Sequence, residues 1–413
     1  MKNLKVKKLR YITTLFVATS FISLQAQTDK TVVDTTTVDT AAVVLPWPQN
    51  IQARLDTLML DPMLERTQLG LMVYDLTADS VLYSYGAKQT LRPASTMKLL
   101  TAVTALDQLG SRYRYNTSLR YTGEVKDSVL TGDLYCVGGM DPMFEMRDMK
   151  AFVQSVKALG IDSIHGNLVA VTNFKEENLL GEGWCWDDDN PQLTPLLVDR
   201  KNEFMSRLMQ GLRDEGIAVD GACTTGSTPK EALTLSTCTH TLKEILEPML
   251  KESDNLYAES MFFQIAASMG KRPATSAHGR QLIKKTLGKA GISDIPYRIA
   301  DGSGLSLYNY VTPELLTKLL IYAYRNQRIF MDLYTSLPIA GQDGTLKKRM
   351  KEPYVNGKVR AKTGTLSGIS SLAGYAMTPN YHMLAFCIIN QGIMKNSDGR
   401  GFQDRVCAAL CRE

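Results

Sequence analysis

Ser95 and Lys98 stand three residues apart in the segment LRPASTMKLLTAV (residues 91–103), in which a proline precedes an apolar helical pattern. On an α-helix this separation is about 300° of rotation, so both side chains would lie on one face, one turn apart. A neighbouring amine can remove the proton that a serine hydroxyl must lose before it attacks a carbonyl carbon. The pair therefore has the spacing of a nucleophile and its base.

Spacing alone does not identify the nucleophile. The same pattern recurs at Ser227/Lys230 and at Ser268/Lys271, because serine and lysine are common residues. Other residues of suitable chemistry are needed to decide among the three pairs.

Two short motifs further along the chain favour the first pair. Residues 253–255 read SDN within a predicted helical region, and residues 362–364 read KTG at the predicted start of a strand. The order S-x-x-K, SDN, KTG is the signature of penicillin-recognising serine acyl enzymes. Ser268 follows the second motif, and Ser227 lies in a segment that we interpret below as an insertion, so neither fits this order.

We predict that Ser95 attacks the substrate carbonyl and that Lys98 removes its proton. Only a neutral lysine can do so, and an unperturbed pKa near 10.4 makes deprotonation at pH 7 unfavourable by about 4.6 kcal/mol. Burial and the charge of Lys362 would both lower the pKa of Lys98. Ser253 would relay the proton between the leaving amine and the two lysines, and Asn255 would hydrogen-bond the substrate or a lysine.

The KTG strand is expected to bind the substrate. Lys362 supplies positive charge, Thr363 and Thr365 supply hydroxyl groups, and Gly364 lets another backbone approach closely. Together they suit a peptide with a free terminal carboxylate, which could add to the strand edge. The backbone N–H groups of Ser95 and Thr365 would form the oxyanion hole.

The pattern of elements predicts an α+β fold, with one antiparallel sheet flanked by helices. Apolar residues at helical spacing over 99–109 predict a buried helix with Ser95 at its N-terminus. Two alternating strands near the N-terminus are joined as a hairpin, and the C-terminal strands are expected beside them. These strands and the closing helix are predicted over residues 69–76, 80–87, 360–368, 370–378, 383–390 and 401–412.

Composition divides the chain into four parts. Basic residues, an apolar run over 11–24 and small residues near Ala26 predict a signal peptide over 1–26. A membrane anchor is the alternative, but this run is shorter than the roughly 20 residues that span a bilayer. The remaining parts are a Thr-rich flexible linker over 27–45, a catalytic domain over 46–112 and 241–413, and an inserted domain over 113–240.

Charge and cysteine content limit the possible partners. The formal net charge of +5 equals the five basic residues of the leader, so the mature chain gives no reason to expect nucleic-acid binding. Cys223 and Cys238 flank a turn-rich segment and are the predicted disulfide, if one forms. The four histidines are dispersed, and Cys238 with His240 is interpreted as incidental, so neither a metal nor a cofactor is predicted.

With these three motifs the chain resembles the D-alanyl-D-alanine carboxypeptidase/endopeptidase family of low-molecular-mass class C penicillin-binding proteins. Beyond the three motifs, the resemblance rests on GDLYCVGGMDP, GEGWCWDD, VDRKNEF, ADGSGLS and LPIAGQDGTL, and it runs from about Pro46 to the end. It implies a penicillin-binding/β-lactamase-like transpeptidase fold with a helical subdomain.

The resemblance also implies an activity and its partners. The expected reaction is hydrolysis of the terminal D-Ala-D-Ala bond, of D-Ala-diamino acid crosslinks, or of both, in peptidoglycan stem peptides, through an acyl-enzyme on Ser95. β-Lactams are expected to acylate the same serine. The expected location is the periplasm or cell envelope, and the oligomeric state is left open.

Several positions depart from the family pattern. The second family insert is missing around residues 195–204, and relatives often have a basic residue at Leu307 and Gln at Ser367. The resemblance places Asp188 in the cleft, where its carboxylate would pair with the ammonium of the stem peptide's third residue. Because Leu307 and Ser367 lack the side chains that relatives use for the acid group of that residue, we expect recognition to rest more on the ammonium.

Two alternative functions fit the sequence less well. A class A β-lactamase shares the three motifs but adds an E-x-x-L-N base, and the nearest string here, EENLL at 176–180, lacks the asparagine. A non-catalytic peptidoglycan-binding protein would have no reason to keep every acylating group.

Overall fold

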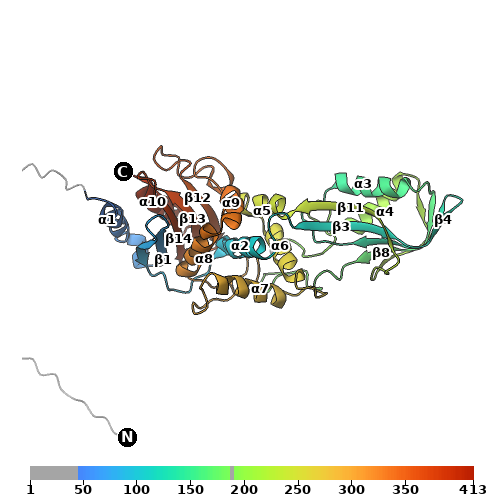
Figure 1. Cartoon of the computed structure of the whole chain (residues 1–413), viewed down its shortest axis with the longest axis horizontal. Coiled ribbons are helices and arrows are strands. Elements are labelled where there is room, and N and C mark those ends of the chain that lie inside the picture. Colours follow the sequence, from blue (N-terminus) through green and yellow to red (C-terminus); the bar gives the residue numbers. More distant parts are fainter. Residues whose placement is uncertain (1–44, 187–189) are drawn as a thin grey trace, which may run out of the picture. The chain divides into compact units, whose positions relative to one another are not determined.

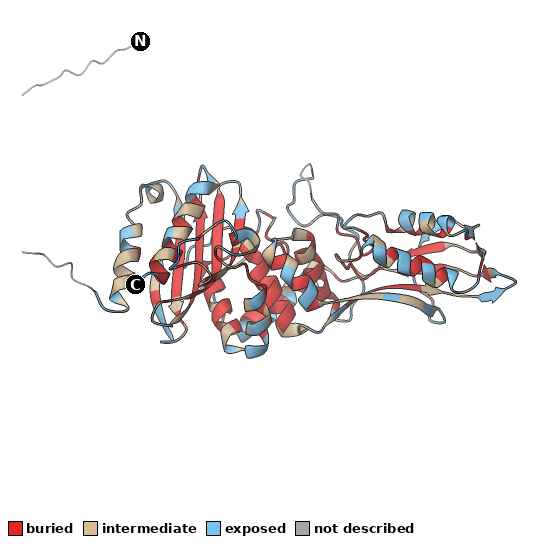
Figure 2. Ribbon diagram, turned by 90° about the horizontal axis from the view of Figure 1, so that it is seen from above, coloured by how far each residue is buried: buried red, intermediate tan, exposed pale blue. Residues whose placement is uncertain are grey.

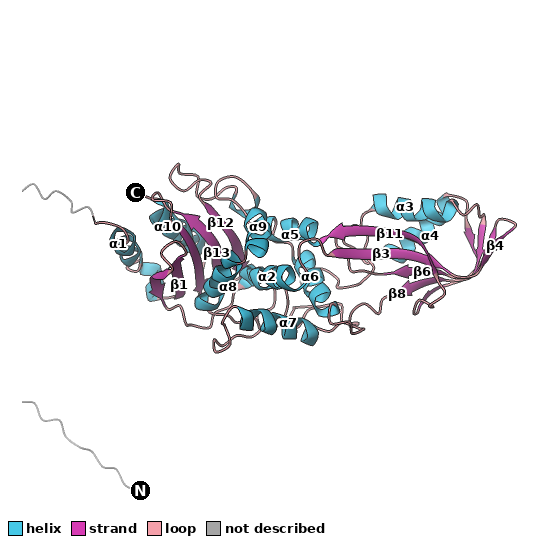
Figure 3. Ribbon diagram, viewed as in Figure 1, coloured by secondary structure: helices cyan, strands magenta, loops and turns pink. Residues whose placement is uncertain are grey.

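The computed structural model, which describes residues 45–186 and 190–413, contains a five-stranded antiparallel sheet that lies beside α1 and α10 (Figures 1 and 3). The expected signal peptide and all but the last residue of the expected linker lie outside the described residues. The strand order is β12-β13-β14-β1-β2. The strands are β1 Gln68–Asp75, β2 Ser80–Tyr85, β12 Val359–Leu366, β13 Ile369–Met377 and β14 Met383–Gln391.

The predicted N-terminal hairpin and its pairing with the C-terminal strands are confirmed. β1 and β2 pair as a hairpin, and β1 pairs with β14 along its full length, from Gln68 opposite Gln391 to Asp75 opposite Leu384. β12, which carries the KTG motif, is an edge strand of this sheet. Only one of its two sides pairs with another strand of the sheet. The motif is at the middle of β12 rather than at its start, where the sequence placed it.

Both faces of the sheet are covered by helices. Successive residues of a strand point to opposite faces, and accordingly Leu372 packs with one apolar cluster and Ala373 with the other. One face packs against α1 Gln49–Leu58 and α10 Asn396–Cys411, and the other against helices that include α2 Lys98–Gln108 and α8 Pro313–Arg325. Figure 2 shows the central strands as largely buried.

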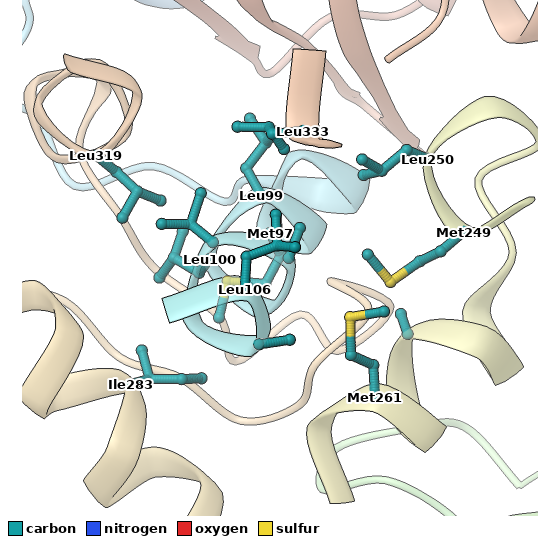
Figure 4. Packing of buried hydrophobic residues seen from close by; sticks show 14 of the residues in the cluster. Met97, Leu99, Leu100, Leu106, Met249, Leu250, Met261, Ile283, Leu319 and Leu333 are labelled. Carbon is teal, nitrogen blue, oxygen red and sulfur yellow. The ribbon is translucent and has the colours of Figure 1, made fainter. Parts of the chain in front are cut away.

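The α2 helix lies inside a second, helical group. It is buried from Lys98 through Leu106. Figure 4 shows apolar side chains of other helices around it, among them Met249, Met261, Ile283, Leu319 and Leu333. These helices are α5 Leu242–Lys251, α6 Asn255–Ala267, α7 Ser276–Lys289, α8 and α9 Gln327–Ser336. An amphipathic helix has one buried stripe, whereas α2 is buried on every side over these residues because other helices surround it.

Within residues 45–186 and 190–413, short 3-10 turns are found at three places. They are η1 Pro62–Glu65, η2 Ala94–Met97 and η3 Gly344–Leu346. Ser95 belongs to η2, which runs directly into α2, so Ser95 lies just before the α-helix rather than within its first turn.

The SDN motif interrupts the helical region that the sequence predicted as long. α5 ends at Lys251, α6 begins at Asn255, and Ser253 has a left-handed backbone with φ 65°. A non-glycine residue rarely adopts that conformation, and such residues concentrate at functional sites. Asp254 caps α6 by accepting a hydrogen bond from the Tyr257 N–H, which positions Asn255 as the first helical residue.

Two smaller sheets lie between α2 and α5. Arg114 faces Thr241 in the pairing of β3 with β11, so the chain leaves and returns at adjacent points. The sheet orders are β10-β8-β6-β3-β11 and β4-β5-β7-β9. The elements are β3 Arg114–Tyr121, β4 Glu124–Lys126, β5 Val129–Thr131, β6 Leu134–Val137, α3 Met146–Lys157, β7 Ser163–His165, β8 Leu168–Val171, α4 Phe204–Asp214, β9 Ala218–Val219, β10 Cys223–Thr225 and β11 Leu233–Thr241.

The loop after β6 connects this region to α6. Gln264 Nε2 donates to the Gly139 carbonyl over 2.6 Å, and the Ser260 hydroxyl donates to the Met140 carbonyl. Beside this loop, His240 Nδ1 lies 2.7 Å from the buried Asp141 carboxylate, which raises the pKa of His240 to about 10 mainly through this hydrogen bond. Hydrogen bonds thus join the loop to α6, the helix that begins with Asn255, and a charged pair joins the same loop to β11.

The predicted disulfide between Cys223 and Cys238 is wrong. All seven cysteines lie in the described part of the chain, and each is free. Cys223 is on β10 and Cys238 on β11, the opposite edges of a five-stranded sheet. Four interstrand steps correspond to roughly 19 Å, whereas a disulfide requires Cα atoms within about 7 Å.

None of the helices in the described ranges is long and apolar enough to cross a bilayer.

Two glycines of α7 provide a test of the packing that supports α6. A Cβ at Gly279 would lie 2.7 Å from the Phe262 ring of α6, whereas Gly288 has open space around it. We expect Gly279→Ala to lower the free energy of unfolding by about 1–3 kcal/mol through overpacking. Gly288→Ala should raise it by about 0.5–1 kcal/mol, because alanine is the better helix former. Urea denaturation of both variants measures the difference, and equal effects would contradict the close approach of α6 and α7.

Candidate active site

The Lys98 amine is the point where the predicted catalytic residues meet. Its Nζ lies 3.0 Å from Ser95 Oγ and 2.7 Å from Asn255 Oδ1, and it donates to the Ser303 carbonyl over 2.8 Å. Lys98 is fully buried, while Ser95 is partly exposed. The structure therefore brings together the first residue pair and the asparagine of the SDN motif.

A second lysine holds the serine of the SDN motif. Lys362 Nζ donates to Ser253 Oγ and to the Thr363 carbonyl, each over 2.8 Å, and the Lys362 side chain is fully buried. The Thr363 hydroxyl donates to the Thr345 hydroxyl of η3 over 2.8 Å. Thr365, two residues further along β12, is exposed.

Close backbone approaches join β12 to η2. A Cβ on Gly364 would lie 2.9 Å from the Ser95 nitrogen and 2.8 Å from the Pro93 carbonyl oxygen. The Ser371 hydroxyl of β13 also donates to the Pro93 carbonyl, over 2.6 Å. Gly364 therefore permits the contact that sets the edge strand beside the serine.

The turn formed by residues 301–304 completes the site and was not predicted to take part. Besides the Ser303 carbonyl that accepts from Lys98, the Gly302 carbonyl accepts from the Thr101 hydroxyl of α2 over 2.6 Å. A Cβ on Gly304 would lie 1.9 Å from the Ala94 carbonyl oxygen. The segment ADGSGLS was noted only for its resemblance to the family, and its DGSG string is the signal that could have identified a tight turn.

Two buried carboxylates hold this turn in place. Glu259 accepts hydrogen bonds from the Gly302 and Ser303 N–H groups at 2.7–3.2 Å. Asp301 accepts from Gly304 and Ser306 N–H groups and from the side chains of Asn309 and Trp184, at 2.7–2.8 Å. Burial and the charge of Asp301 raise the pKa of Glu259 to about 8.

Burial lowers the pKa of Lys98 to about 8, against the opposing charges of Asp301, Glu259 and Asp254. Deprotonation at pH 7 is then unfavourable by about 1.4 kcal/mol rather than about 4.6 kcal/mol. The predicted effect of burial is therefore present. The sequence predicted that the charge of Lys362 lowers the pKa of Lys98, but the influence runs from Lys98 to Lys362. Burial, and after it the charge of Lys98, place the pKa of Lys362 well below its usual value.

The two other serine-lysine pairs lie outside this arrangement. The Ser268 hydroxyl donates to the Ile265 carbonyl over 2.7 Å, at the point where α6 ends. Ser227 lies in the connection between β10 and β11. Asp188, the remaining predicted substrate-binding residue, lies outside the described residues.

An antiparallel sheet with an edge KTG strand, a buried S-x-x-K helix and an SDN turn between helices defines the class of penicillin-recognising serine enzymes. The chain belongs to the D-Ala-D-Ala carboxypeptidase 3 (S13) family, which matches residues 51–197 and 192–412. The protein is thus a serine peptidase of the D-Ala-D-Ala carboxypeptidase class, as the motifs predicted.

Individual relatives agree with this placement. The chain is 25% identical over 407 residues to D-alanyl-D-alanine carboxypeptidase DacB of Haemophilus influenzae, covering 78% of this chain and 85% of that protein. It is 27% identical over 438 residues to the D-alanyl-D-alanine carboxypeptidase of Actinomadura sp. strain R39, covering 82% and 80%.

Solved structures confirm the predicted fold. Penicillin-binding protein 4 of H. influenzae superposes with a TM-score of 0.80 at 24% identity, covering 88% of this chain and 100% of that one. The same protein in complex with a β-lactam superposes with a TM-score of 0.74 at 23% identity, with the same coverage.

Substitution of Gly364 tests the contact between β12 and η2. We expect Gly364→Ala to lower the second-order rate constant of acylation by penicillin about 100-fold, because a displacement near 1 Å at a reacting group has an effect of this size. Stopped-flow or quenched-flow measurement with intact-mass detection gives the rate constant. Gly288→Ala, a glycine with open space, is the control, and an unchanged rate constant in Gly364→Ala would contradict the proposed importance of the contact.

Proposed function

We propose that the protein hydrolyses the terminal D-Ala-D-Ala bond of peptidoglycan stem peptides, D-Ala-diamino acid crosslinks, or both, through an acyl-enzyme on Ser95. The observation that carries this proposal is the 3.0 Å contact of Ser95 Oγ with a fully buried lysine amine. Burial gives that amine a pKa of about 8, which leaves a useful neutral fraction near neutral pH. A serine next to such a base is an activated nucleophile.

Acylation follows from these contacts. Neutral Lys98 takes the hydroxyl proton as Ser95 Oγ bonds to the substrate carbonyl carbon, and the carbonyl π electrons move to its oxygen. When the tetrahedral intermediate collapses, the C–N bond breaks and the leaving amine takes a proton from Ser253. Ser253 regains a proton from Lys362, which contacts its Oγ over 2.8 Å. Lys362 in turn receives the proton that Lys98 took from Ser95, so Lys98 is neutral again. In deacylation, neutral Lys98 takes a proton from the water that attacks the ester carbonyl carbon. The bond to Ser95 Oγ then breaks, and Ser95 Oγ regains a proton from Lys98.

The developing negative charge on the carbonyl oxygen needs N–H donors. We assign this role to the backbone N–H groups of Ser95 and Thr365. The close approach of Gly364 to the Ser95 nitrogen supports the assignment, because Thr365 is the next residue along β12. Donors held in advance by strand and turn need little reorganisation during the reaction.

The exposed side of β12 suits an extended peptide. An added strand would form main-chain hydrogen bonds along this edge, and the Thr363 and Thr365 hydroxyls near Lys362 suit its terminal carboxylate. β-Lactams are inferred to acylate Ser95, and the β-lactam complex of the H. influenzae protein supports this. A substrate in the cell wall is consistent with the signal peptide predicted from residues 1–26, and we infer a periplasmic or cell-envelope location.

Intact-mass spectrometry after exposure to penicillin tests the nucleophile. We expect one adduct of the full penicillin mass that persists for minutes. Ser95→Ala should abolish it, while Ser268→Ala and Ser227→Ala, the matched controls, should keep it. An adduct that survives in Ser95→Ala, or rapid release of hydrolysed penicillin, would show that the assignment is wrong.

The pH dependence of acylation tests the base. Because only neutral Lys98 accepts the proton, and its neutral fraction grows as pH rises towards its pKa of about 8, the acylation rate constant should increase about tenfold per pH unit below that value. It should level off above it. Rate constants from pH 5.5 to 9.5 check this, with circular dichroism to show that the fold is retained. A profile that is flat between pH 6 and 9 would exclude Lys98 as the base.

A further inference from the structure

Three side chains of metal-ligating types meet beside the loop that follows β6. They are Cys238 and His240 of β11 and Asp141 of the loop, and one sulfur, nitrogen or oxygen atom from each lies within 4.8 Å of the other two. His240 Nδ1 and Asp141 Oδ2 are 2.7 Å apart. In the sequence Cys238 and His240 stand without a third ligand, and the fold supplies it from 99 positions before His240.

Two of the three side chains share one face of β11. Cys238 and His240 are two residues apart on this strand, so both point to the same side. Thr239 lies between them and points to the other side, where its hydroxyl donates to Asn116 Oδ1 over 2.9 Å. Extended backbone alone therefore holds the thiol and the imidazole next to each other.

Asp141 is fully buried and held in a defined orientation. Its Oδ1 accepts from the Met143 N–H over 3.0 Å, and its Oδ2 faces His240. The carbonyls of Gly139 and Met140, just before it, accept hydrogen bonds from α6. Hydrogen bonds of this kind orient the ligands of metal ions. The third ligand is thus positioned by backbone contacts on both sides.

A buried hydroxyl group beside the cluster has no partner. Tyr115 lies opposite His240 in the pairing of β3 with β11, so the two side chains leave the same face of the sheet. Tyr115 is fully buried, and within residues 45–186 and 190–413 its hydroxyl has no hydrogen-bond partner. Burial, then Tyr113 and then the charge of Asp141 raise the pKa of Tyr115, so the hydroxyl lies near this carboxylate. A buried polar group without a partner is unfavourable, and a water bound to an ion at the cluster would supply one.

We propose that Cys238, His240 and Asp141 bind a Zn²⁺ ion. Thiolate and imidazole are ligands that zinc prefers, whereas Mg²⁺ and Ca²⁺ take oxygen ligands. Zinc bonds of about 2.0–2.3 Å place the atoms of a tetrahedral site roughly 3.3–3.8 Å apart, so His240 Nδ1 and Asp141 Oδ2 separate by about 1 Å on binding. Cys238 and His240 are partly exposed, so the ion and a water as fourth ligand can enter. This assignment replaces the interpretation of Cys238 and His240 as incidental.

Binding exchanges protons for the ion. The Cys238 thiol and Nδ1 of the His240 imidazolium each release one proton to solvent, because the thiolate and the unprotonated ring nitrogen are the ligating forms. The Nδ1 proton is the one that joins His240 to Asp141, so zinc takes its place between the two side chains. The ion then ties β11 to the loop that contacts α6, and zinc should stabilise the folded chain.

Cobalt(II) is a suitable probe because it substitutes for zinc and shows a thiolate ligand by charge-transfer absorption in the near ultraviolet. We expect one equivalent of Co²⁺ to produce this absorption in the wild-type protein, and Zn²⁺ to abolish it by displacement. Cys238→Ser should remove the absorption, and His240→Gln should weaken the affinity for Co²⁺ at least about tenfold. With Zn²⁺ at about 100 times its Kd, Tm should rise by about 2–4 °C in the wild type and stay unchanged in Cys238→Ser.

Matched controls separate this site from other thiols and from the reaction at Ser95. Cys185 and Cys223 are free and exposed, and Cys185→Ser and Cys223→Ser should keep both the absorption and the rise in Tm. Mg²⁺ should not raise Tm. Cys238→Ser should keep its circular dichroism spectrum and its penicillin adduct on Ser95, so a failure of the zinc site is distinguishable from a failure of the proposed function. An absorption that survives in Cys238→Ser or is lost in either control variant would show an adventitious ion only. That result, or no absorption in the wild type, would overturn the proposal.

Discussion

Lys98 has no exposed surface, and its amine is surrounded by the Ser95 hydroxyl, the Asn255 amide oxygen and the Ser303 carbonyl. An ammonium group away from water is unfavourable unless hydrogen bonds compensate for lost solvation. Three acceptors replace part of the solvation that the ammonium group loses. Because the replacement is incomplete, burial still lowers the pKa of Lys98. The burial of α2 thus lowers the pKa of the amine that we propose as the base.

This arrangement depends on backbones that pass unusually close to one another. Gly364 allows β12 to lie against the Ser95 nitrogen, and Gly304 allows the 301–304 turn to lie against the Ala94 carbonyl. Ala94 itself has a left-handed backbone, with φ 47°. Close-packed protein interiors transmit such constraints directly, so the serine is positioned by a strand, a turn and a helix at once.

Opposite charges balance around the two buried lysines. Glu259 and Asp301 lie behind Lys98 and favour its ammonium form, while Lys98 disfavours the ammonium form of Lys362. The carboxylates are themselves held by backbone N–H groups of the 301–306 segment, so their primary structural effect is to fix the turn that binds Lys98. The two carboxylates therefore both affect the charge state of Lys98 and fix the backbone of the turn that accepts its hydrogen bond.

Local patterns in the sequence were sufficient to predict the motif residues, the hairpin and the α+β class. S-x-x-K, SDN and KTG consist of consecutive or nearly consecutive residues, and strand alternation or helical spacing is visible within short windows. The participation of Ser303, Glu259 and Asp301 could not be predicted in this way, since their contacts join segments far apart in the chain. The sequence also misplaced the disulfide, because only sheet order shows that Cys223 and Cys238 lie on opposite edges.

The same distinction applies to charge. The sequence by itself determined which groups can titrate and that Lys98 stands on an apolar helix. Only the tertiary structure decided which charge acts on which lysine, and that Arg92 lies beside Leu307. The physical reason is that hydrogen bonds and Coulomb interactions depend on distances of a few ångströms and on burial, which packing sets between residues that the sequence separates by hundreds of positions.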